Sequence, residues 1–142
     1  MRQRKGPLHV VGAILLQGDR ILVGRRAPHK SAAGLWEFPG GKVEAGESPT
    51  GALVREVQEE MGLTIEAHKT FDVSETFVGE TVIRLEVIIC ELIGEFSGRG
   101  GDHDAFAWIA SEDLFSLEWA KPDLPAVAEL SRMESFIELR DF

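Results

Sequence analysis

Runs of apolar, often β-branched residues are the most prominent pattern along this chain, and they predict a protein built mainly of strands. The first two runs flank Gln17-Gly18-Asp19, a sequence typical of a hairpin turn. Two longer runs follow in the middle of the chain, and the second of these is the strongest strand signal. The strands predicted in this way are 9–16, 20–25, 36–38, 65–77, 81–93 and 105–109.

Helices are predicted at three places. One begins at Ser48, whose hydroxyl can cap it, with Pro49 at the first helical position, where no backbone N–H is needed. This helix is expected to end at Gly62. A short helical turn is predicted at 111–115 and an amphipathic helix at 125–139. Because strands outnumber helices and one helix lies mid-chain, we expect an α+β protein with helices packed on a mixed sheet.

Composition predicts a folded domain whose negative charge opposes the binding of anions. The 142 residues suit a single domain spanning 1–142, and 44% of them are hydrophobic, which argues against disorder. The 15 basic and 24 acidic residues give a net charge of −9. Such a chain is not expected to bind a nucleic-acid duplex by bulk attraction. An anionic substrate would require a metal ion or a local basic patch.

The single cysteine and the N-terminus bear on location. Cys90 lies in an apolar run, so we expect a buried strand thiol and a reducing compartment. Basic residues within the first five positions precede the apolar run 10–16, as in a signal peptide. No small-residue cleavage site follows, and the run is too short to span a membrane. We therefore predict a first strand and a cytoplasmic protein without membrane association.

Three glutamates share one edge of the predicted mid-chain helix. On a helical wheel, Glu56, Glu59 and Glu60 fall within an arc of roughly 100°. Like charges this close repel one another, so a positive partner is expected. Two interpretations remain open. The edge is either a solvated acidic face with Arg and Lys partners, or a set of oxygen ligands for Mg²⁺ or Mn²⁺.

The wider spacing around this helix is highly specific. Gly41 is followed after five residues by Glu47, and after seven more by Arg55-Glu56-Val57-Gln58-Glu59-Glu60-Met61-Gly62-Leu63. Seven specified residues, each at a frequency of roughly 5–8%, match by chance at about one start in 10⁸. At every fixed position the segment 41–63 resembles the signature of the Nudix hydrolases.

This resemblance implies the Nudix fold, an α/β/α sandwich around a mixed β-sheet, and it implies roles for the signature residues. Gly41, Glu47, Arg55 and Gly62 would be structural, with Glu47 paired to Arg55 to fix the loop against the helix. Glu56 and Glu59 would be catalytic, and we choose Glu56 to accept the proton of the attacking water. The implied ligands of Mg²⁺ (or Mn²⁺) are the carbonyl of Gly40 and the side chains of Glu56, Glu59, Glu60 and Asp102.

Residues outside the signature resemble one branch of the superfamily, the MutT-like and CTP-pyrophosphatase-like enzymes. The similar stretches are Gly24-Arg25-Arg26 and Gly34-Leu35-Trp36-Glu37-Phe38-Pro39-Gly40-Gly41-Lys42. The resemblance implies that Arg26 and Lys42 contact substrate, with a surface pair at a strand end as the alternative for Arg26. Asp102 lies six residues before Trp108, where this branch often has a further acidic metal ligand. Its alternatives are a solvated loop acid, or ligation by the neighbouring His103 or Asp104.

Base recognition is implied for three residues. The segment Ala120-Lys121-Pro122-Asp123-Leu124-Pro125 resembles the one that opens the last helix of MutT-like enzymes, where Asn or Asp contacts the base. Asp123 is the candidate here, with a helix cap as the alternative. An acceptor-only carboxylate favours amino groups such as that of cytosine. Phe38 and Trp119 can stack on a base or pack in the core. The four histidines show no metal-binding spacing and are expected to be ordinary surface or loop residues.

The expected function is hydrolysis of a nucleoside triphosphate to a monophosphate and pyrophosphate with Mg²⁺, on a CTP-like or oxidised purine (8-oxo-dGTP) substrate. One alternative is a Nudix enzyme acting on ADP-ribose, a dinucleoside polyphosphate or an RNA 5′ end. Another is an inactive Nudix ligand-sensing module, against which the intact signature argues. We expect a monomer or a homodimer.

Overall fold

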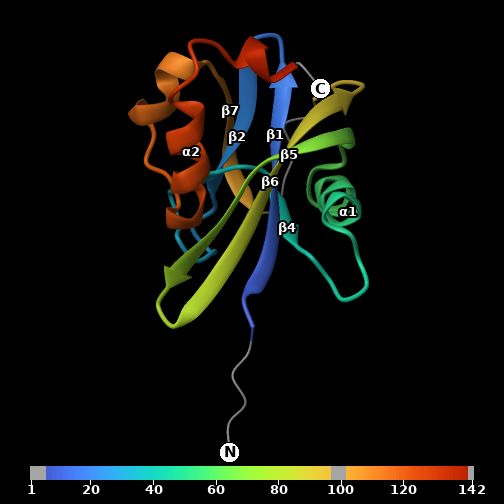
Figure 1. Ribbon diagram of the computed structural model, residues 1–142, viewed down its shortest axis with the longest axis vertical. Helices are drawn as coiled ribbons and strands as arrows, with labels where there is room; N and C mark the ends of the chain where they lie inside the picture. The colour runs from blue at the N-terminus through green and yellow to red at the C-terminus, as the bar shows by residue number, and fades with distance from the viewer. Residues whose placement is uncertain (1–5, 97–101, 141–142) are drawn as a thin grey trace, which may run out of the picture.

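A mixed sheet with helical segments on both sides forms the centre of the molecule (Figure 1). The computed structural model describes residues 6–96 and 102–140; the N-terminal basic residues and most of the glycine-rich stretch 94–101 lie outside them. The longest strands are β1 (Leu8–Gln17), β2 (Arg20–Arg26), β5 (Thr64–Val78) and β6 (Thr81–Ile93). Strands β1 and β6 run parallel, whereas the other pairs are antiparallel. The predicted α+β class with a mixed sheet is confirmed.

The sheet divides where β1 and β2 separate. These strands pair only beside their hairpin turn; further along, β1 pairs with the short strand β4 (Gly40–Lys42). Strand β2 instead pairs with β3 (Trp36–Glu37) and β7 (His103–Ile109). Strand β4 is not predicted from the sequence, because Pro39-Gly40-Gly41 is typical of a break. Pairing is possible because Gly40 has no side chain: a Cβ there would collide with the carbonyl oxygen of Val11.

Helix α1 (Pro49–Met61) begins and ends where the sequence predicts. The Ser48 hydroxyl accepts a hydrogen bond from the Gly51 N–H at 3.1 Å, and Gly62 ends the helix in the left-handed conformation. The apolar face of α1 packs on one side of the sheet. Its buried residues are Ala52, Leu53, Val57 and Met61. An adjoining edge of the helix carries the glutamates.

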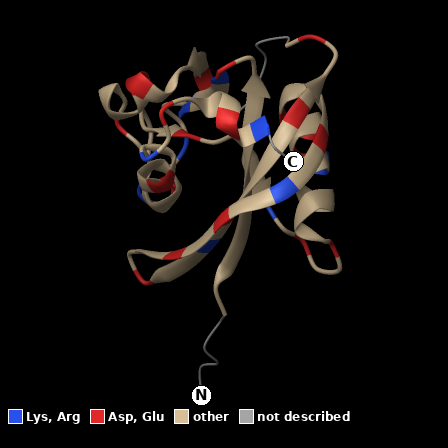
Figure 2. Cartoon of the chain, turned by 45° about the horizontal axis from the view of Figure 1, so that its top comes forward, with Lys and Arg blue, Asp and Glu red and all other residues tan. Residues whose placement is uncertain are grey.

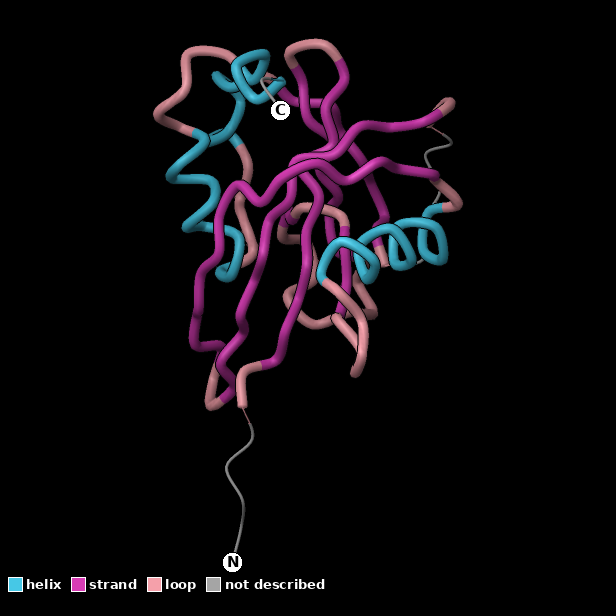
Figure 3. Tube along the Cα trace, turned by 45° about the vertical axis from the view of Figure 1, so that its right-hand side comes forward, coloured by secondary structure: helices cyan, strands magenta, loops and turns pink. Residues whose placement is uncertain are grey.

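The C-terminal third covers the other side of the sheet (Figure 3). It contains the 3₁₀ helices η1 (Ser111–Ser116), η2 (Lys121–Asp123) and η3 (Phe136–Arg140) and the short helix α2 (Leu124–Leu130). The predicted single helix 125–139 is wrong beyond Leu130. Ser131 donates a hydrogen bond to the Ala128 carbonyl, and Ser135 accepts one from the Ile137 N–H. Such local bonds compete with the helix, and the resulting turn lets Phe136 become fully buried.

Strand β1 is buried on both faces, which explains why its sequence is a continuous apolar run rather than an alternating one. Val11 and Leu15 face α1, whereas Ile14 and Leu16 face the C-terminal segments. Cys90 on β6 is buried on the α1 side, as predicted, and burial raises the pKa of its thiol to about 12. No helix within residues 6–96 and 102–140 is long and apolar enough to cross a membrane.

Candidate active site

A cleft of about 670 Å³ opens where the sheet divides, and both charged and apolar side chains line it. The charged ones include Lys30, Glu56 and Asp102. The apolar ones include side chains of β1 and β6, and Phe38 and the buried Asp123 belong to the same lining. Acidic residues are spread over many of the described elements (Figure 2), so the cleft is distinguished by how its acids are arranged and not by their number.

Glu56 is a half-buried glutamate in the wall of the cleft. Its side chain is 16% exposed and lines the cleft. It lies against the backbone of β4, where a Cβ on Gly41 would collide with the carboxyl group. Glycine is therefore required at position 41, because any side chain would displace Glu56 from the cleft.

Arg55 is the positive partner that the cluster of glutamates requires. Its Nε and Nη2 donate to the two carboxylate oxygens of Glu47 at 2.7 and 2.8 Å, a bidentate pair. Its Nη1 donates to Glu56 at 2.9 Å and to Glu59 at 3.1 Å. Nη2 also reaches the carbonyl of Lys42 at 3.1 Å. One guanidinium thus joins the loop, β4 and the acidic edge of α1, the structural arrangement that the resemblance implied for Glu47 and Arg55.

Glu47 is expected to make stability depend on acid pH. The hydrogen bond from Arg55, followed by that from the Glu44 N–H, lowers the pKa of Glu47 from 4.5 to about 2. This contribution is complete above pH 4.5 and is lost as the pH falls toward about 2, because the unfolded chain then binds the proton first. Thermal unfolding across this range should therefore show a steeper loss of stability in the wild type than in Glu47→Gln. Parallel curves for the two proteins would contradict this account.

Glu60 and Asp102 form an acidic pair beside Glu56. Burial raises the pKa of Glu60, and the charges of Asp102 and Glu56 raise it further. The ammonium group of Lys30 lies 3.1 Å from the Asp102 carboxylate, and its charge offsets the rise in the pKa of Glu60 only in part. Of the alternatives for Asp102, Asp104 is paired with Arg25 at 2.8 Å. A group of crowded carboxylates that lack enough positive charge is the donor set that a hard divalent cation prefers.

Gly40 and Glu59 differ in their position relative to the cleft. Gly40 lines it. Glu59 lies at the outer edge of α1, where its side chain is 59% exposed and bound to Arg55. Gly40, Glu56 and Asp102 thus line the cleft, and Glu60 lies beside the last two, whereas Glu59 is not among the described lining residues.

Arg26 lies on the wall of the cleft and is held by hydrogen bonds from all three guanidinium nitrogens. Nη1 donates to both oxygens of Glu37 at 3.1 and 3.0 Å, Nε to the Ser31 carbonyl at 2.6 Å, and Nη2 to the Ser31 hydroxyl at 3.3 Å. The exposed strand-end pair is made instead by Arg25 with Asp104. Lys42, also predicted to contact substrate, is exposed at the edge of the cleft.

Asp123 does not cap helix α2. Its side chain makes no capping hydrogen bond; its Oδ2 accepts from the Phe38 N–H at 2.8 Å. Asp123 is only 6% exposed, and burial, followed by the charge of Glu37, raises its pKa well above the usual value. Phe38 lines the cleft beside it. Trp119 packs behind Phe38 with ring centroids 5.5 Å apart and donates its indole N–H to the Leu114 carbonyl, so the structure places it in the core.

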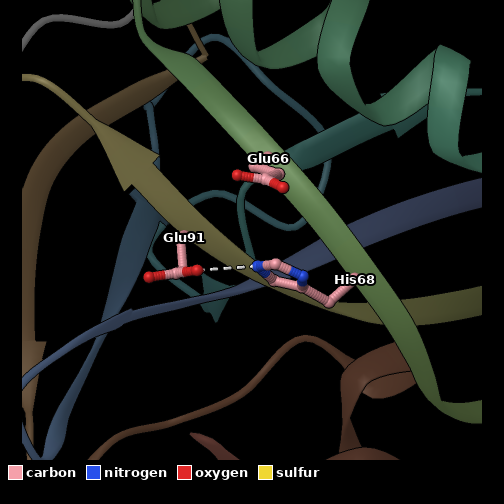
Figure 4. Close-up of side chains that lie close together, drawn as sticks. All are labelled: Glu66, His68 and Glu91. Carbon is pink, nitrogen blue, oxygen red and sulfur yellow. Dashed lines mark hydrogen bonds and ion pairs between the residues drawn. The ribbon is translucent and has the colours of Figure 1, made fainter. Parts of the chain in front are cut away.

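Two histidines are not the ordinary surface or loop residues that the sequence suggested. His103 is buried and its Nε2 lies 2.9 Å from Glu37. His68 on β5 lies 2.8 Å from Glu91 on β6, with Glu66 beside them (Figure 4). The potential ligand atoms of these last three residues lie within 4.8 Å of one another. Alternation places Glu66 and His68 on one face of β5, but only the pairing with β6 brings Glu91 opposite Glu66.

Comparison with known proteins decides the family. The NUDIX domain matches residues 7–130. The chain belongs to the Nudix family. It is 34% identical over 124 residues to the putative 8-oxo-dGTP diphosphatase 2 of Mycobacterium tuberculosis, covering 87% of each protein. It is 33% identical over 135 residues to the CTP pyrophosphohydrolase of Escherichia coli, covering 94% of this chain and 93% of that protein.

Solved Nudix structures agree with this assignment. The solution structure of the E. coli ORF135 protein superposes with a TM-score of 0.70 at 32% identity, over 94% of this chain and 91% of that one. Together these relatives place the chain in the MutT-like branch and identify it as a Nudix hydrolase. Nudix hydrolases generally use a divalent metal ion, and the crowded acids around Glu56 fit one.

Proposed function

We propose that this Nudix hydrolase converts nucleoside triphosphates to monophosphates and pyrophosphate with Mg²⁺, as an enzyme that sanitises the nucleotide pool. The observation that carries the proposal is the mixed lining of the cleft. Crowded carboxylates that favour a hard cation lie around Glu56 and Asp102, and Phe38 and the buried Asp123 line the same cleft. A nucleotide has the same two-part character, with a charged phosphate chain and a flat base.

The charged part of the lining is suited to the phosphates. The carbonyl of Gly40 and the side chains of Glu56, Glu59, Glu60 and Asp102 would hold Mg²⁺, for which Mn²⁺ can substitute. When bound, the ion lowers the pKa of water and offsets charge on the phosphates. Glu56, enclosed by Gly41 and oriented by Arg55, is positioned to accept a proton from the attacking water. Arg26, Lys30 and Lys42 would contribute positive charge in an otherwise acidic protein.

The lining around Phe38 is suited to the base. Phe38 is buried in the wall of the cleft, and the apolar side chains of Val10, Ile83 and Leu85 line the cleft with it. Because the pKa of Asp123 is raised, its carboxyl group keeps its proton to a higher pH than an exposed acid. A protonated acid can donate as well as accept, so the preference for pyrimidines argued from an acceptor-only carboxylate no longer holds. Both a CTP-like substrate and 8-oxo-dGTP fit, in agreement with the two relatives' names.

A substrate screen tests the proposal directly. Canonical, oxidised and methylated nucleoside triphosphates would be incubated with the protein and Mg²⁺ or Mn²⁺, with pyrophosphate and phosphate measured separately. Pyrophosphate release that is abolished by chelation supports the proposal. Release only from ADP-ribose, dinucleoside polyphosphates or capped RNA ends would replace it with another Nudix activity. Nucleotide binding without any turnover would indicate a ligand-sensing module.

Asp123→Asn is expected to change base preference more than rate. Asparagine keeps the acceptor for the Phe38 N–H but fixes an amide donor in place of a titratable proton. The ratio of kcat/KM for 8-oxo-dGTP to that for CTP should change by about tenfold, the effect of one altered hydrogen bond. Asp113→Asn is the matched control, because Asp113 accepts from the Ala110 N–H outside the cleft. An equal change for all nucleotides would remove Asp123 from base recognition.

Location and assembly complete the proposal. We retain the cytoplasm as the compartment and a monomer or homodimer as the assembly. Cell fractionation and light scattering of the purified protein test these two points.

A further inference from the structure

His103 joins two strands of the sheet across a third. Its side chain is 4% exposed, on β7, and Glu37 lies on β3, with β2 between them. The contact passes over Gly24, which pairs with Glu37 in the sheet. A Cβ at Gly24 would lie 2.6 Å from Cδ2 of the His103 ring, so the ring can occupy this position only because residue 24 is glycine.

The hydrogen bond that His103 makes has a defined direction. Glu37 already accepts from Arg26 through both oxygens, so its carboxylate acts as an acceptor, and the Nε2 of His103 must donate at 2.9 Å. The other ring nitrogen, Nδ1, is buried and has no hydrogen-bond partner within residues 6–96 and 102–140. An apolar side chain would fill this space without leaving a polar atom unsatisfied. The imidazole is therefore explained by what its Nε2 does for Glu37.

We propose that His103 is a positioning residue: through Glu37 it fixes the Arg26 guanidinium on the wall of the substrate cleft. This inference rests on the proposed function. Oε2 of Glu37 accepts hydrogen bonds from both His103 and Arg26. Arg26 is held further by its hydrogen bonds to Ser31. Without the donor from β7, Glu37 is held by Arg26 alone, and the positive charge of Arg26 is less firmly positioned on the wall of the cleft. Nucleotide binding should weaken, whereas the chemistry at Glu56 should not change.

The experiment compares steady-state kinetics of His103→Leu, His103→Gln and Gly24→Ala on the best substrate from the screen. His103→Leu is expected to raise KM about tenfold with kcat within about threefold of wild type, the pattern of lost ground-state binding. His103→Gln retains an N–H donor and should restore KM to within about threefold of the wild-type value. Gly24→Ala leaves His103 in place but displaces its ring, so it should reproduce the rise in KM. His68→Leu is the control, because it removes a histidine–carboxylate contact outside the cleft.

The outcomes separate this proposal from a structural role and from the proposed function. An unchanged KM in His103→Leu, a loss of kcat alone, or equal behaviour of the Gln and Leu variants would overturn it. If His103→Leu does not fold, the KM of Gly24→Ala tests the proposal instead. A raised KM supports the proposal, and an unchanged KM overturns it. In wild-type protein labelled with ¹⁵N-histidine, a protonated Nε2 of His103 is expected by NMR, and an unprotonated one would also overturn it. Absence of any nucleotide turnover by the wild type would refute the proposed function instead.

Discussion

Glu56→Gln is expected to lower kcat by about 10²–10⁴-fold while leaving the fold intact. Glutamine has the same shape, so it fits against Gly41 and can still accept the hydrogen bond from Arg55 at its amide oxygen. It cannot take a proton from water, and it removes one negative charge from the proposed metal site. The measurement is kcat at saturating nucleotide and Mg²⁺, with circular dichroism and thermal unfolding recorded on the same sample.

Two further variants make this result specific. Glu66→Gln removes an exposed carboxylate on β5, outside the cleft, and should retain wild-type kcat. Glu59→Gln is expected to lower turnover by several powers of ten, because a proposed metal ligand is lost. Near-normal turnover of Glu59→Gln would remove it from the metal site, whereas near-normal turnover of Glu56→Gln would refute the catalytic role proposed for Glu56.

Arg55→Leu is expected to lower both kcat and the melting temperature. The substitution leaves the carboxylates of Glu47, Glu56 and Glu59 without the guanidinium that holds them. We expect kcat to fall by at least about a hundredfold, because small displacements of catalytic groups have effects of this size. Arg55→Lys should recover little activity, since an ammonium group cannot make the bidentate pair with Glu47.

The control for Arg55 is an arginine whose ion pair lies on the surface. Arg132 pairs with Glu129 at 2.9 Å, and its side chain is 73% exposed. Arg132→Leu should change neither kcat nor melting temperature appreciably, because exposed ion pairs contribute little. Equal effects of the two leucine variants would mean that Arg55 acts only through general surface charge.

Local chemistry made parts of this protein predictable from its sequence. Ser48, Pro49 and Gly62 fixed the limits of α1, because a cap, a missing N–H and a left-handed residue act over a few positions. Helical periodicity likewise placed Glu56 and Glu60 on the edge that the core does not bury. The turn after Leu130 was not predictable in this way, because burial of Phe136 against the sheet outweighs the continuing amphipathic pattern.

The family and the acidic edge of α1 are predictable from the sequence, because the spacing from Gly41 to Leu63 is set along one stretch of chain. Which side chains share the cleft depends on how distant strands pair. Asp123 turned out to bind the Phe38 N–H rather than cap a helix, and His103 to reach Glu37 across Gly24. These contacts join segments far apart in the chain, and strand pairing, which no local pattern encodes, brings them together.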